Sequence, residues 1–512
     1  VFSAVDRRFL HATAGLGYSN PFLPERIEWE RAALGREYLE SEPVWSVSVA
    51  DPDADLPNIL RIHEKQVELI EGLYRRLAAA SSLAADELAD YEDSVHSLLY
   101  QRYYRNFVEA NGRWGFYRDF LADWNRYLVV PGKRFETVLR PAHVFACFYQ
   151  LQRAFHYIFY NIIGSSMPAA RLRASIWQSV FTHDMRRYRR TLYARMGDFP
   201  TLITGPSGTG KELVARAIAG SRYVPFDADR LEFAGQRAGG PAADTFYPVN
   251  VAALSPALIE SELFGHRRGS FTGALGDRKG WLETCPPLGT VFLDELGEME
   301  LLLQVKLLRA IETRRFSAVG DTALREFRGK LIAATNRDLR DEIRLKHFRE
   351  DLYYRLCADL IRTPSLREQI EASPGVLREL TLFMVRRVAG EEADRCLEEV
   401  ERWMKEHLPL DYSWPGNYRE LEQCVRNVII RGSYQPVAAS ENGDDFYTQF
   451  RGGKLKMDEV LGYYASLVYR QCGSYEEAAR RLGVDRRTVK ARVDNNWSPT
   501  VRNPPGPARN AP

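Results

Sequence analysis

The sequence has 512 residues, of which 45% are hydrophobic and 27% are charged, and its formal net charge is +2. This length predicts about three domains, and the composition excludes a collagen-like chain, a polyelectrolyte and a wholly disordered chain. Because the charges nearly balance, any contact with nucleic acid must come from a local basic surface.

The cysteines and the apolar runs bear on the cellular compartment. The six cysteines lie far apart and form no C-x-x-C pair, which suggests neither a zinc site nor a disulfide framework and favours a reducing environment. The chain opens without a basic region followed by an apolar core, and its most apolar aromatic run, residues 155–163, is too short to span a bilayer. We therefore expect a soluble, cytoplasmic protein with no membrane partner.

The first 160 residues are rich in aromatic residues and arginine. Apolar residues recur three and four apart in residues 62–80 and 86–110, which predicts helices. We expect residues 1–160 to form a mainly helical regulatory domain, whose signal the sequence does not name. The aromatic side chains favour a helical core over a ligand cage. They include Tyr100, Tyr103, Tyr104, Trp114, Phe116 and Tyr117.

The pattern of apolar residues changes at Thr201, where short apolar runs begin to alternate with segments of helical periodicity. This alternation predicts an α/β domain over residues 161–365, with a parallel sheet covered on both faces. Residues 366–432 show a helical pattern only. The polar stretch 433–453 reads as a linker, residues 454–496 as a short basic helical domain, and the proline-rich residues 497–512 as a disordered tail.

A glycine-rich loop follows the predicted strand 201–204 and opens a predicted helix. This arrangement places backbone N–H groups and the positive end of the helix around phosphates, so the loop predicts a nucleoside triphosphate site. Glu212 stands where such loops usually carry the hydroxyl that binds Mg²⁺, so we expect Mg²⁺ to be held elsewhere. The predicted ligands in this loop are Gly205, Ser207, Gly208, Thr209, Gly210, Lys211 and Glu212.

Two glycines flank a Phe-Thr pair in the segment Gly269-Ser270-Phe271-Thr272-Gly273-Ala274. Glycines at both sides make a flexible turn that presents an aromatic ring and a hydroxyl to solvent. Such a turn contributes little to folding and suits binding to a partner.

Polar residues end two later apolar runs. The run 291–293 leads to Asp294 and Glu295, and the run 330–335 leads to Asn336. We expect Asp294 to hold Mg²⁺ and Glu295 to orient and polarise the attacking water, because phosphoryl transfer depends on positioning and on charge neutralisation. Asn336 lies at the carboxyl end of a strand, where open α/β sheets bind ligands, and can sense the γ-phosphate.

The basic segment near the C-terminus has the pattern of two short helices. Ser474 and Glu477 form a capping-box pattern, Gly483 makes a turn, and Asp485 can cap a second helix. This predicts a helix-turn-helix whose second helix enters the major groove of double-stranded DNA. The predicted DNA-binding residues are Arg486, Arg487, Thr488, Lys490 and Arg492.

Together these motifs resemble the AAA+ ATPase domain of bacterial enhancer-binding proteins, the transcription activators that work with sigma-54 RNA polymerase. The similarity covers about residues 163–432, and residues 454–496 are similar to the family's Fis-like helix-turn-helix domain. Glu212 fits the family's G-T-G-K-E loop. Residues 269–274 match the family's G-A-F-T-G-A loop, which contacts sigma-54, except at Ser270. The resemblance implies an α/β fold: an AAA+ P-loop parallel sheet with a helical lid, a mainly helical N-terminal domain before it, and a helix-turn-helix domain after it.

The resemblance also implies roles for residues that the patterns alone do not assign. Asn250 corresponds to the asparagine that restrains the catalytic glutamate. Arg349 and Arg355 correspond to arginines that enter the nucleotide site of a neighbouring subunit, which implies a homo-oligomeric ring, a hexamer. Arg419 corresponds to the second sensor of the lid and would lie against the phosphates. The implied cofactors are ATP and Mg²⁺.

The function implied by the resemblance is that of a sigma-54-dependent transcriptional regulator, which binds an upstream, enhancer-like DNA site and uses ATP hydrolysis to remodel the closed complex of sigma-54 RNA polymerase. One alternative is a DNA-binding regulator whose ATPase domain controls oligomerisation without sigma-54 activation; another is a general unfoldase or chelatase. Departures from the family pattern leave the rate of turnover open. They are Pro206, Cys357, the longer stretch 222–246 and the extra segment 186–196.

Overall fold

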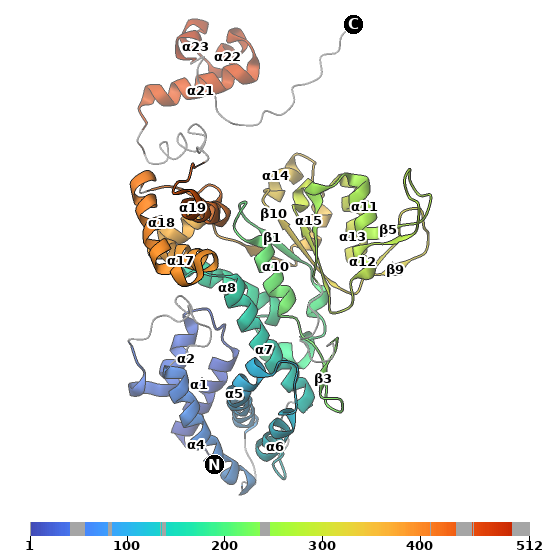
Figure 1. Ribbon diagram of the computed structural model, residues 1–512, viewed down its shortest axis with the longest axis vertical. Helices are drawn as coiled ribbons and strands as arrows, with labels where there is room; N and C mark the ends of the chain where they lie inside the picture. Colours follow the sequence, from blue (N-terminus) through green and yellow to red (C-terminus); the bar gives the residue numbers. More distant parts are fainter. Residues whose placement is uncertain are drawn as a thin grey trace. The chain divides into compact units, whose positions relative to one another are not determined.

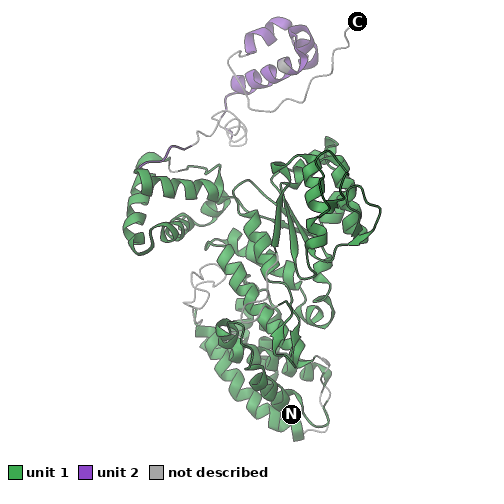
Figure 2. Ribbon diagram, turned by 45° about the vertical axis from the view of Figure 1, so that its right-hand side comes forward, with its two compact units in different colours: residues 1–432 green, residues 433–512 purple. Residues whose placement is uncertain are grey.

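A computed structural model of the chain describes residues 2–40, 57–79, 84–133, 140–235, 246–409, 411–436 and 455–493, together with residues 135 and 453. The chain divides into two compact units, Val1–Gly432 and Ser433–Pro512, and Figure 2 colours them separately. The predicted linker 433–453 lies mostly outside the described residues, and residues 494–512, including the predicted tail, lie wholly outside them.

The first unit begins with a set of helices. Ser3 starts the first of them with a capping box, in which its hydroxyl accepts the N–H of Asp6 at 3.1 Å and the Asp6 carboxylate accepts the N–H of Ser3 at 2.9 Å. The main helices are α1 (Ala4–Tyr18), α2 (Glu25–Leu34), α4 (Pro57–Ala79), α5 (Ala85–Glu109), α6 (Tyr117–Leu128), α7 (Pro141–Asn161) and α8 (Met167–Phe181). Shorter helical turns lie after α2, at η1 (Gly35–Glu37), and after α8, at α9 (Met185–Arg187), η2 (Tyr188–Leu192) and η3 (Met196–Asp198).

Most of the aromatic residues in these helices form a core. Phe145 of α7 contacts Phe107 at a ring-centroid distance of 4.8 Å and Tyr117 at 5.0 Å. A hairpin from the stretch 222–246, made of β2 (Phe226–Asp227) and β3 (Glu232–Phe233), adds Phe226 and Phe233 to this core. The extension of the α/β region therefore packs on the N-terminal helices.

A five-stranded parallel sheet forms the centre of the α/β region (Figure 1). Its order is β11 (Asp359–Arg362), β1 (Thr201–Thr204), β10 (Lys330–Thr335), β7 (Thr290–Asp294) and β4 (Phe246–Asn250). Parallel pairing requires crossover connections, which is why helices alternate with strands along this part of the chain. The connecting helices are α10 (Lys211–Gly220), α11 (Pro256–Phe264), α12 (Trp281–Thr284), α13 (Leu301–Thr313), α14 (Leu339–Arg344) and α15 (Glu350–Leu356). The short elements are η4 (Val251–Ala253), β5 (Gly265–His266), β6 (Arg278–Lys279), η5 (Leu296–Glu298), β8 (Arg315–Phe316) and β9 (Arg325–Glu326).

Both faces of the sheet are covered, as the near-continuous apolar strands require. Ile203 and Ile332 face α8 and α10, whereas Leu202 and Leu331 face the side of α11, α13 and α15. Alternate residues of each strand thus belong to two separate cores.

Four helices and a short 3-10 turn complete the first unit. They are α16 (Leu366–Ala372), α17 (Val376–Ala389), η6 (Gly390–Glu392), α18 (Ala393–His407) and α19 (Asn417–Arg431). The second unit contains α21 (Met457–Cys472), α22 (Tyr475–Leu482) and α23 (Arg486–Arg492), around a core of Val468, Ala478, Ala479 and Val489. The predicted fold class, an α/β parallel sheet with flanking helical regions, is confirmed; the exact domain boundaries stay predictions. Of the helices described, none has the length and apolar character needed to cross a membrane.

Candidate functional site

The loop between β1 and α10 is held in a conformation that only glycine adopts easily. Gly205, Gly208 and Gly210 have φ values of 150°, 76° and 83°. A Cβ atom at Gly205 would lie 2.1 Å from Thr363 Oγ1, and one at Gly208 would lie 2.2 Å from the carbonyl oxygen of Gly416. The loop is therefore packed tightly against neighbouring segments, which fixes the directions of its backbone N–H groups.

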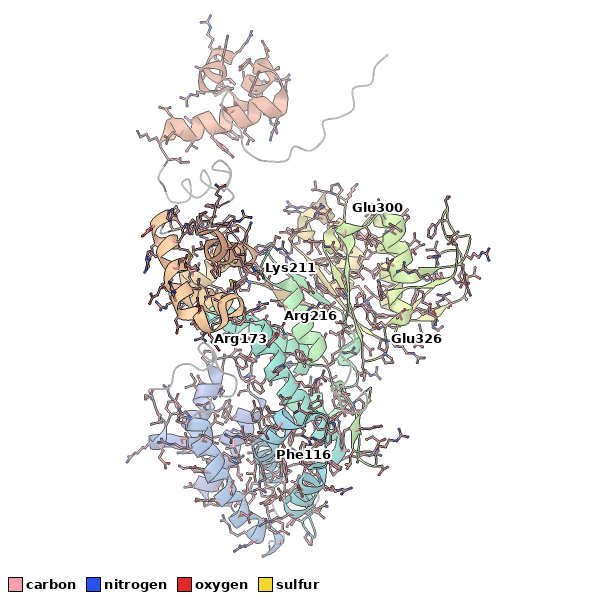
Figure 3. All side chains as sticks on the ribbon, viewed as in Figure 1. Phe116, Arg173, Lys211, Arg216, Glu300 and Glu326 are labelled. Atoms are coloured by element: carbon pink, nitrogen blue, oxygen red, sulfur yellow. The ribbon has the colours of Figure 1, made fainter. Side chains whose placement is uncertain are left out.

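Lys211 begins α10 and holds its ammonium group over this loop. The side chain is buried, and Nζ donates to the carbonyl oxygens of Gly205 and Pro206, both at 3.1 Å. Burial lowers the pKa of Lys211, and the nearby carboxylates of Glu295 and Asp294 oppose that shift. A buried cation next to backbone donors is a suitable receptor for an anion. Figure 3 labels Lys211 at the start of α10.

Glu212, which stands at the hydroxyl position of the loop, is engaged along the helix instead. Its Oε1 accepts hydrogen bonds from Nε of Arg216 at 2.9 Å and from Nη2 of Arg216 at 2.7 Å. Arg216 in turn lies over the ring of Phe246, with its guanidinium carbon 4.5 Å from the ring centroid. This pairing gives Glu212 a structural partner one helical turn away from the loop.

The acid pair lies at the carboxyl edge of the sheet. Asp294 ends β7, and its Oδ1 accepts the N–H of Glu295 at 2.9 Å. Glu295 has φ 54° in the left-handed region, which is strained for a residue other than glycine, and such strain gathers at functional sites. Asn250 is the register partner of Asp294 on β4, and Asn336 follows β10 on the other side of β7.

The sheet thus brings the phosphate loop, Asp294, Glu295, Asn250 and Asn336 to one edge. The Asn250 side-chain oxygen Oδ1 accepts the N–H of Ala252 at 2.9 Å, so this oxygen bonds its own turn.

The four helices after the sheet, α16 to α19, form the predicted lid. They contact the phosphate loop directly through the start of α19. Asn417 Nδ2 donates to the carbonyl oxygen of Ser207 at 2.9 Å, and the N–H of Tyr418 donates to that of Gly208 at 3.1 Å. Asn417 Oδ1 also accepts the N–H of Leu366 at the start of α16 at 2.9 Å. Arg419 follows on the same turn, exposed and close enough to Lys211 to affect its pKa.

Two residues in this contact escaped the sequence analysis. The hydroxyl of Thr363 shares a hydrogen bond of 2.7 Å with the hydroxyl of Thr209. The N–H of Thr363 donates to the carbonyl oxygen of Thr204, the last residue of β1, at 2.8 Å. Asn417 has φ 53°. Asparagine tolerates this conformation better than most residues, so the Pro-Gly-Asn stretch before a helix was the available signal.

Arg349 and Arg355 lie at the two ends of α15 and are exposed. Arg349 forms an ion pair with Asp351 at 2.7 Å, and its N–H donates to Gln304 Oε1 at 2.8 Å. This backbone bond to a buried glutamine fixes where the helix begins. Both guanidinium groups face outward, where another chain can meet them.

The Phe-Thr loop is the tip of a hairpin between β5 and β6. The N–H of Gly269 donates to the Ala274 carbonyl oxygen at 2.9 Å, and the N–H of Ala274 donates to that of Phe271 at 3.0 Å. Gly269 and Gly273 have φ values of 80° and 102°, so the tight turn requires them. At the base, Arg267 pairs with Asp277 at 2.5 Å and with Asp321 at 3.0 Å. The tip is thus a glycine turn, and the ion pairs of Arg267 fix the base of the hairpin.

The side chains at the tip divide into supported and free ones. Phe271 is half-buried against the His266 ring, at a centroid distance of 5.0 Å, and His266 Nδ1 is 2.7 Å from Ser261 Oγ. Thr272 is exposed, and Leu275 is 89% exposed. Ser270 Oγ is buried without a hydrogen-bond partner among the described residues, so a methyl group would fit there equally well.

In the second unit, the predicted helix-turn-helix pattern corresponds to α22 and α23. Ser474 Oγ accepts the N–H of Glu477 at 3.2 Å, Gly483 turns the chain with φ 66°, and Asp485 Oδ1 accepts the N–H of Arg487 at 2.7 Å. The exposed residues of α23 are Arg486, Arg487, Thr488 and Lys490, whereas Val489 is buried. Arg486 pairs with Glu476 at 2.8 Å, and Arg492 is half-buried and pairs with Asp458 at 3.5 Å.

Known proteins share much of this arrangement. The family of sigma-54 interaction domains matches residues 181–362. Transcriptional regulatory protein ZraR of Klebsiella oxytoca is 37% identical over 312 residues, covering 58% of this chain and 63% of that protein. The Nif-specific regulatory protein of Klebsiella pneumoniae is 43% identical over 233 residues, covering 46% of this chain and 40% of that protein. The DNA-binding transcriptional regulator NtrC of Azospirillum brasilense is 41% identical over 256 residues, covering 49% and 48%. The chain thus spans between 40% and 63% of the length of these relatives, and the resemblance seen in the sequence is confirmed.

Proposed function

We propose that this chain, whose residues 181–362 belong to the family of sigma-54 interaction domains, is a sigma-54-dependent transcriptional regulator driven by ATP hydrolysis. The observation that carries the proposal is the intact Phe271-Thr272 tip, stapled at its base and built on the same domain as the phosphate loop. A loop of this shape exposes a hydroxyl and part of an aromatic ring, which suits a protein partner. That partner is sigma-54 RNA polymerase.

Each residue of the site has a part in hydrolysis. The N–H groups of the glycine loop and Lys211 hold the outer phosphates, Glu295 orients and polarises the attacking water, and Asn336 senses the γ-phosphate. Asp294 presents carboxylate oxygen at the sheet edge, the ligand type that Mg²⁺ prefers, so the residues fit this ion. Bound Mg²⁺ would supply charge neutralisation on the phosphates.

The nucleotide site and the contact loop are joined by a short path along the chain. Asn250 ends β4 opposite Asp294, η4 and α11 follow, and α11 runs directly into β5 of the contact hairpin. A change at the carboxyl edge of the sheet therefore reaches the hairpin through one helix. Arg419 lies on α19, the helix whose start is hydrogen-bonded to the phosphate loop. With this proposed lid, Arg419 would close on the phosphates from the other side.

A ring of subunits completes the proposed ATPase. Arg349 and Arg355 are exposed and would reach the site of the neighbouring protomer, where a guanidinium group stabilises the charge that develops on the phosphoryl group. Exposed apolar side chains on α11 and α13 provide a surface for such a neighbour. They are Leu258, Leu301, Leu302 and Val305. We propose a homo-oligomer, a hexamer.

The basic face of α23 would hold the ring on double-stranded DNA at an upstream, enhancer-like site. Truncation after Gly453 is expected to abolish specific DNA binding and to leave ATP hydrolysis by the first unit intact, as fluorescence anisotropy and phosphate release would show. In the full chain, Arg487→Ala should weaken binding by about tenfold or more. Arg492→Ala should weaken it less, because Arg492 is paired with Asp458. Specific binding by the truncated chain would contradict the assignment.

Transcription assays with purified components test the proposal as a whole. With ATP, the protein should raise open-complex formation at a sigma-54 promoter that carries its binding site and leave a sigma-70 promoter unchanged. A nucleotide analogue that cannot be hydrolysed should give no activation. ATP hydrolysis without any effect at the sigma-54 promoter would favour the alternative, a DNA-binding regulator whose ATPase domain serves oligomerisation.

A further inference from the structure

Every carbonyl group of residues 205–208, in the phosphate loop, accepts a hydrogen bond. The first two accept from Lys211 Nζ, both at 3.1 Å. The last two accept from the start of α19, one from Asn417 Nδ2 at 2.9 Å and the other from the N–H of Tyr418 at 3.1 Å. Lys211 therefore holds the first half of this segment, and the lid holds the second half.

The N–H groups of the same loop remain available to a ligand. Those of residues 207–210 have no acceptor within the part of the chain that the structure describes. The peptide groups are trans and planar, so a C=O and the N–H of the next residue point in opposite directions. The C=O groups of Ser207 and Gly208 point to α19, so the N–H groups of Gly208 and Thr209 point away from it. Free N–H groups where a loop enters a helix are donors to phosphate, and the bonds from α19 set the direction of two of them.

The side chain of Asn417 is bonded at both ends of its carboxamide. Asn417 is 4% exposed. Nδ2 donates to the carbonyl oxygen of Ser207 at 2.9 Å and lies 3.4 Å from that of Pro415, while Oδ1 accepts the N–H of Leu366 at 2.9 Å. An amide can donate and accept at once, which a carboxylate cannot. One side chain thus joins the phosphate loop, the start of α16 and the start of α19.

The turn that carries Asn417 is fixed by its own bonds. Trp414 and Asn417 have φ values of 51° and 53°, in the left-handed region, and the N–H of Asn417 donates to the Trp414 carbonyl oxygen at 2.8 Å. The N–H of Gly416 donates to Glu420 Oε2 at 2.7 Å. A Cβ at Gly208 would lie 2.2 Å from the Gly416 carbonyl oxygen, so the turn is packed against the loop. Backbone strain of this kind persists where the surroundings impose it, and it gathers at functional sites.

We propose that Asn417 is a positioning residue for nucleotide binding, which acts through the phosphate loop. By holding the carbonyl group of Ser207, its side chain directs the N–H of Gly208 to the phosphates. The neighbouring N–H of Tyr418 does the same for the N–H of Thr209. The bond from Asn417 to the start of α16 ties the lid to this geometry. The inference rests on the proposed function, because the ligand is the nucleotide of the proposed ATPase.

Two substitutions remove the bond to the loop and tolerate the left-handed backbone. Asn417→Asp keeps an acceptor for the N–H of Leu366 and loses the donor to Ser207, whereas Asn417→Gly loses both bonds and adds no charge. In the full chain, each should weaken the binding of a fluorescent ADP analogue by about tenfold or more, the effect of ~1.4 kcal/mol. Unchanged affinity in Asn417→Gly would overturn the proposal, because any loss in Asn417→Asp would then come from the added charge.

Asn58→Asp is the matched control. Asn58 is 1% exposed on α4, far along the chain from the nucleotide site, and its carboxamide also bonds one N–H and one carbonyl group, those of Leu39 at 3.0 and 3.3 Å. Both Asp variants bury a carboxylate without a cation, so the Tm should fall in both. Only Asn417→Asp should bind ADP more weakly. An equal loss of affinity in Asn58→Asp would show that general destabilisation causes the effect, and the proposal would be wrong.

Steady-state hydrolysis separates positioning from a loss of folded protein. Weaker binding should raise the KM for ATP about tenfold in both Asn417 variants and leave kcat within about threefold of the parent. A smaller folded fraction would instead lower kcat and leave KM unchanged, and that result would refute the positioning role. Absence of ATP hydrolysis in the parent protein would refute the proposed function, and the affinities for ADP would still decide the role of Asn417.

Discussion

Replacement of Glu295 by glutamine is expected to lower kcat for ATP hydrolysis by roughly 10²–10⁴-fold, the usual contribution of a positioned general base. Glutamine keeps the shape of the side chain but cannot polarise the attacking water. The strained backbone at Glu295, φ 54°, and the bond from its N–H to Asp294 are both retained, so the fold should not change. Phosphate release measures the rate, and a fluorescent ATP analogue measures binding, which should stay within about threefold of the parent.

Two further variants define what that result means. Lys211→Ala should lose nucleotide binding itself, because it removes the buried cation that lies over the loop. Glu326→Gln is the control, since Glu326 is an exposed glutamate on β9 that pairs with Arg328 at 2.8 Å and lies outside the site. Figure 3 labels Lys211 and Glu326. A Glu295→Gln protein with the parent's turnover would show that another residue activates water.

The parts of the site that could be predicted from sequence are those that local rules place. A strand, a glycine loop and a helix in succession define the phosphate loop, and apolar runs ending in Asp294 and Asn336 put both residues at the carboxyl edge of a parallel sheet. These features depend on spacing and residue type, which the sequence displays directly.

The remaining features depend on contacts between distant segments. The bond from Asn417 to Ser207 joins residues 210 positions apart, and the bond between Thr209 and Thr363 joins residues 154 apart. No local pattern encodes such pairs. The packing of Phe226 and Phe233 on Phe145 arises in the same way, because periodicity predicts which face of a helix is buried and not what it meets.

The role of Glu212 at the nucleotide stays a prediction, and in the structure its side chain has a partner on its own helix. Its place in the loop suggests a role at the phosphates, whereas its carboxylate lies on Arg216 one turn along the helix. The pair is exposed, so its contribution to the free energy of folding is small, about 0.3–0.5 kcal/mol for i,i+4 partners. We infer that Glu212 shapes the surface of α10 and that Asp294 holds the metal.

Replacement of Thr272 by alanine is expected to separate ATP hydrolysis from transcription activation. Thr272 is exposed at the tip of the hairpin, while the turn itself depends on Gly269, Gly273 and the ion pair of Arg267 with Asp277. Removal of the hydroxyl should therefore change the free energy of unfolding by no more than about 0.5 kcal/mol. Hydrolysis should stay within about twofold of the parent, because the hairpin tip holds no phosphate ligand.

Activation should fall at least about 30-fold, which corresponds to the ~2 kcal/mol of a central contact at an interface. Open-complex formation at a sigma-54 promoter measures it, alongside phosphate release from the same samples. Thr313→Ala is the matched control, an exposed threonine at the end of α13 whose hydroxyl bonds its own helix at 2.8 Å. If Thr272→Ala activates as well as Thr313→Ala, the hydroxyl at the tip does not contact sigma-54. A fall in both hydrolysis and activation would instead mean that the hairpin supports the nucleotide site, because α11 connects the two.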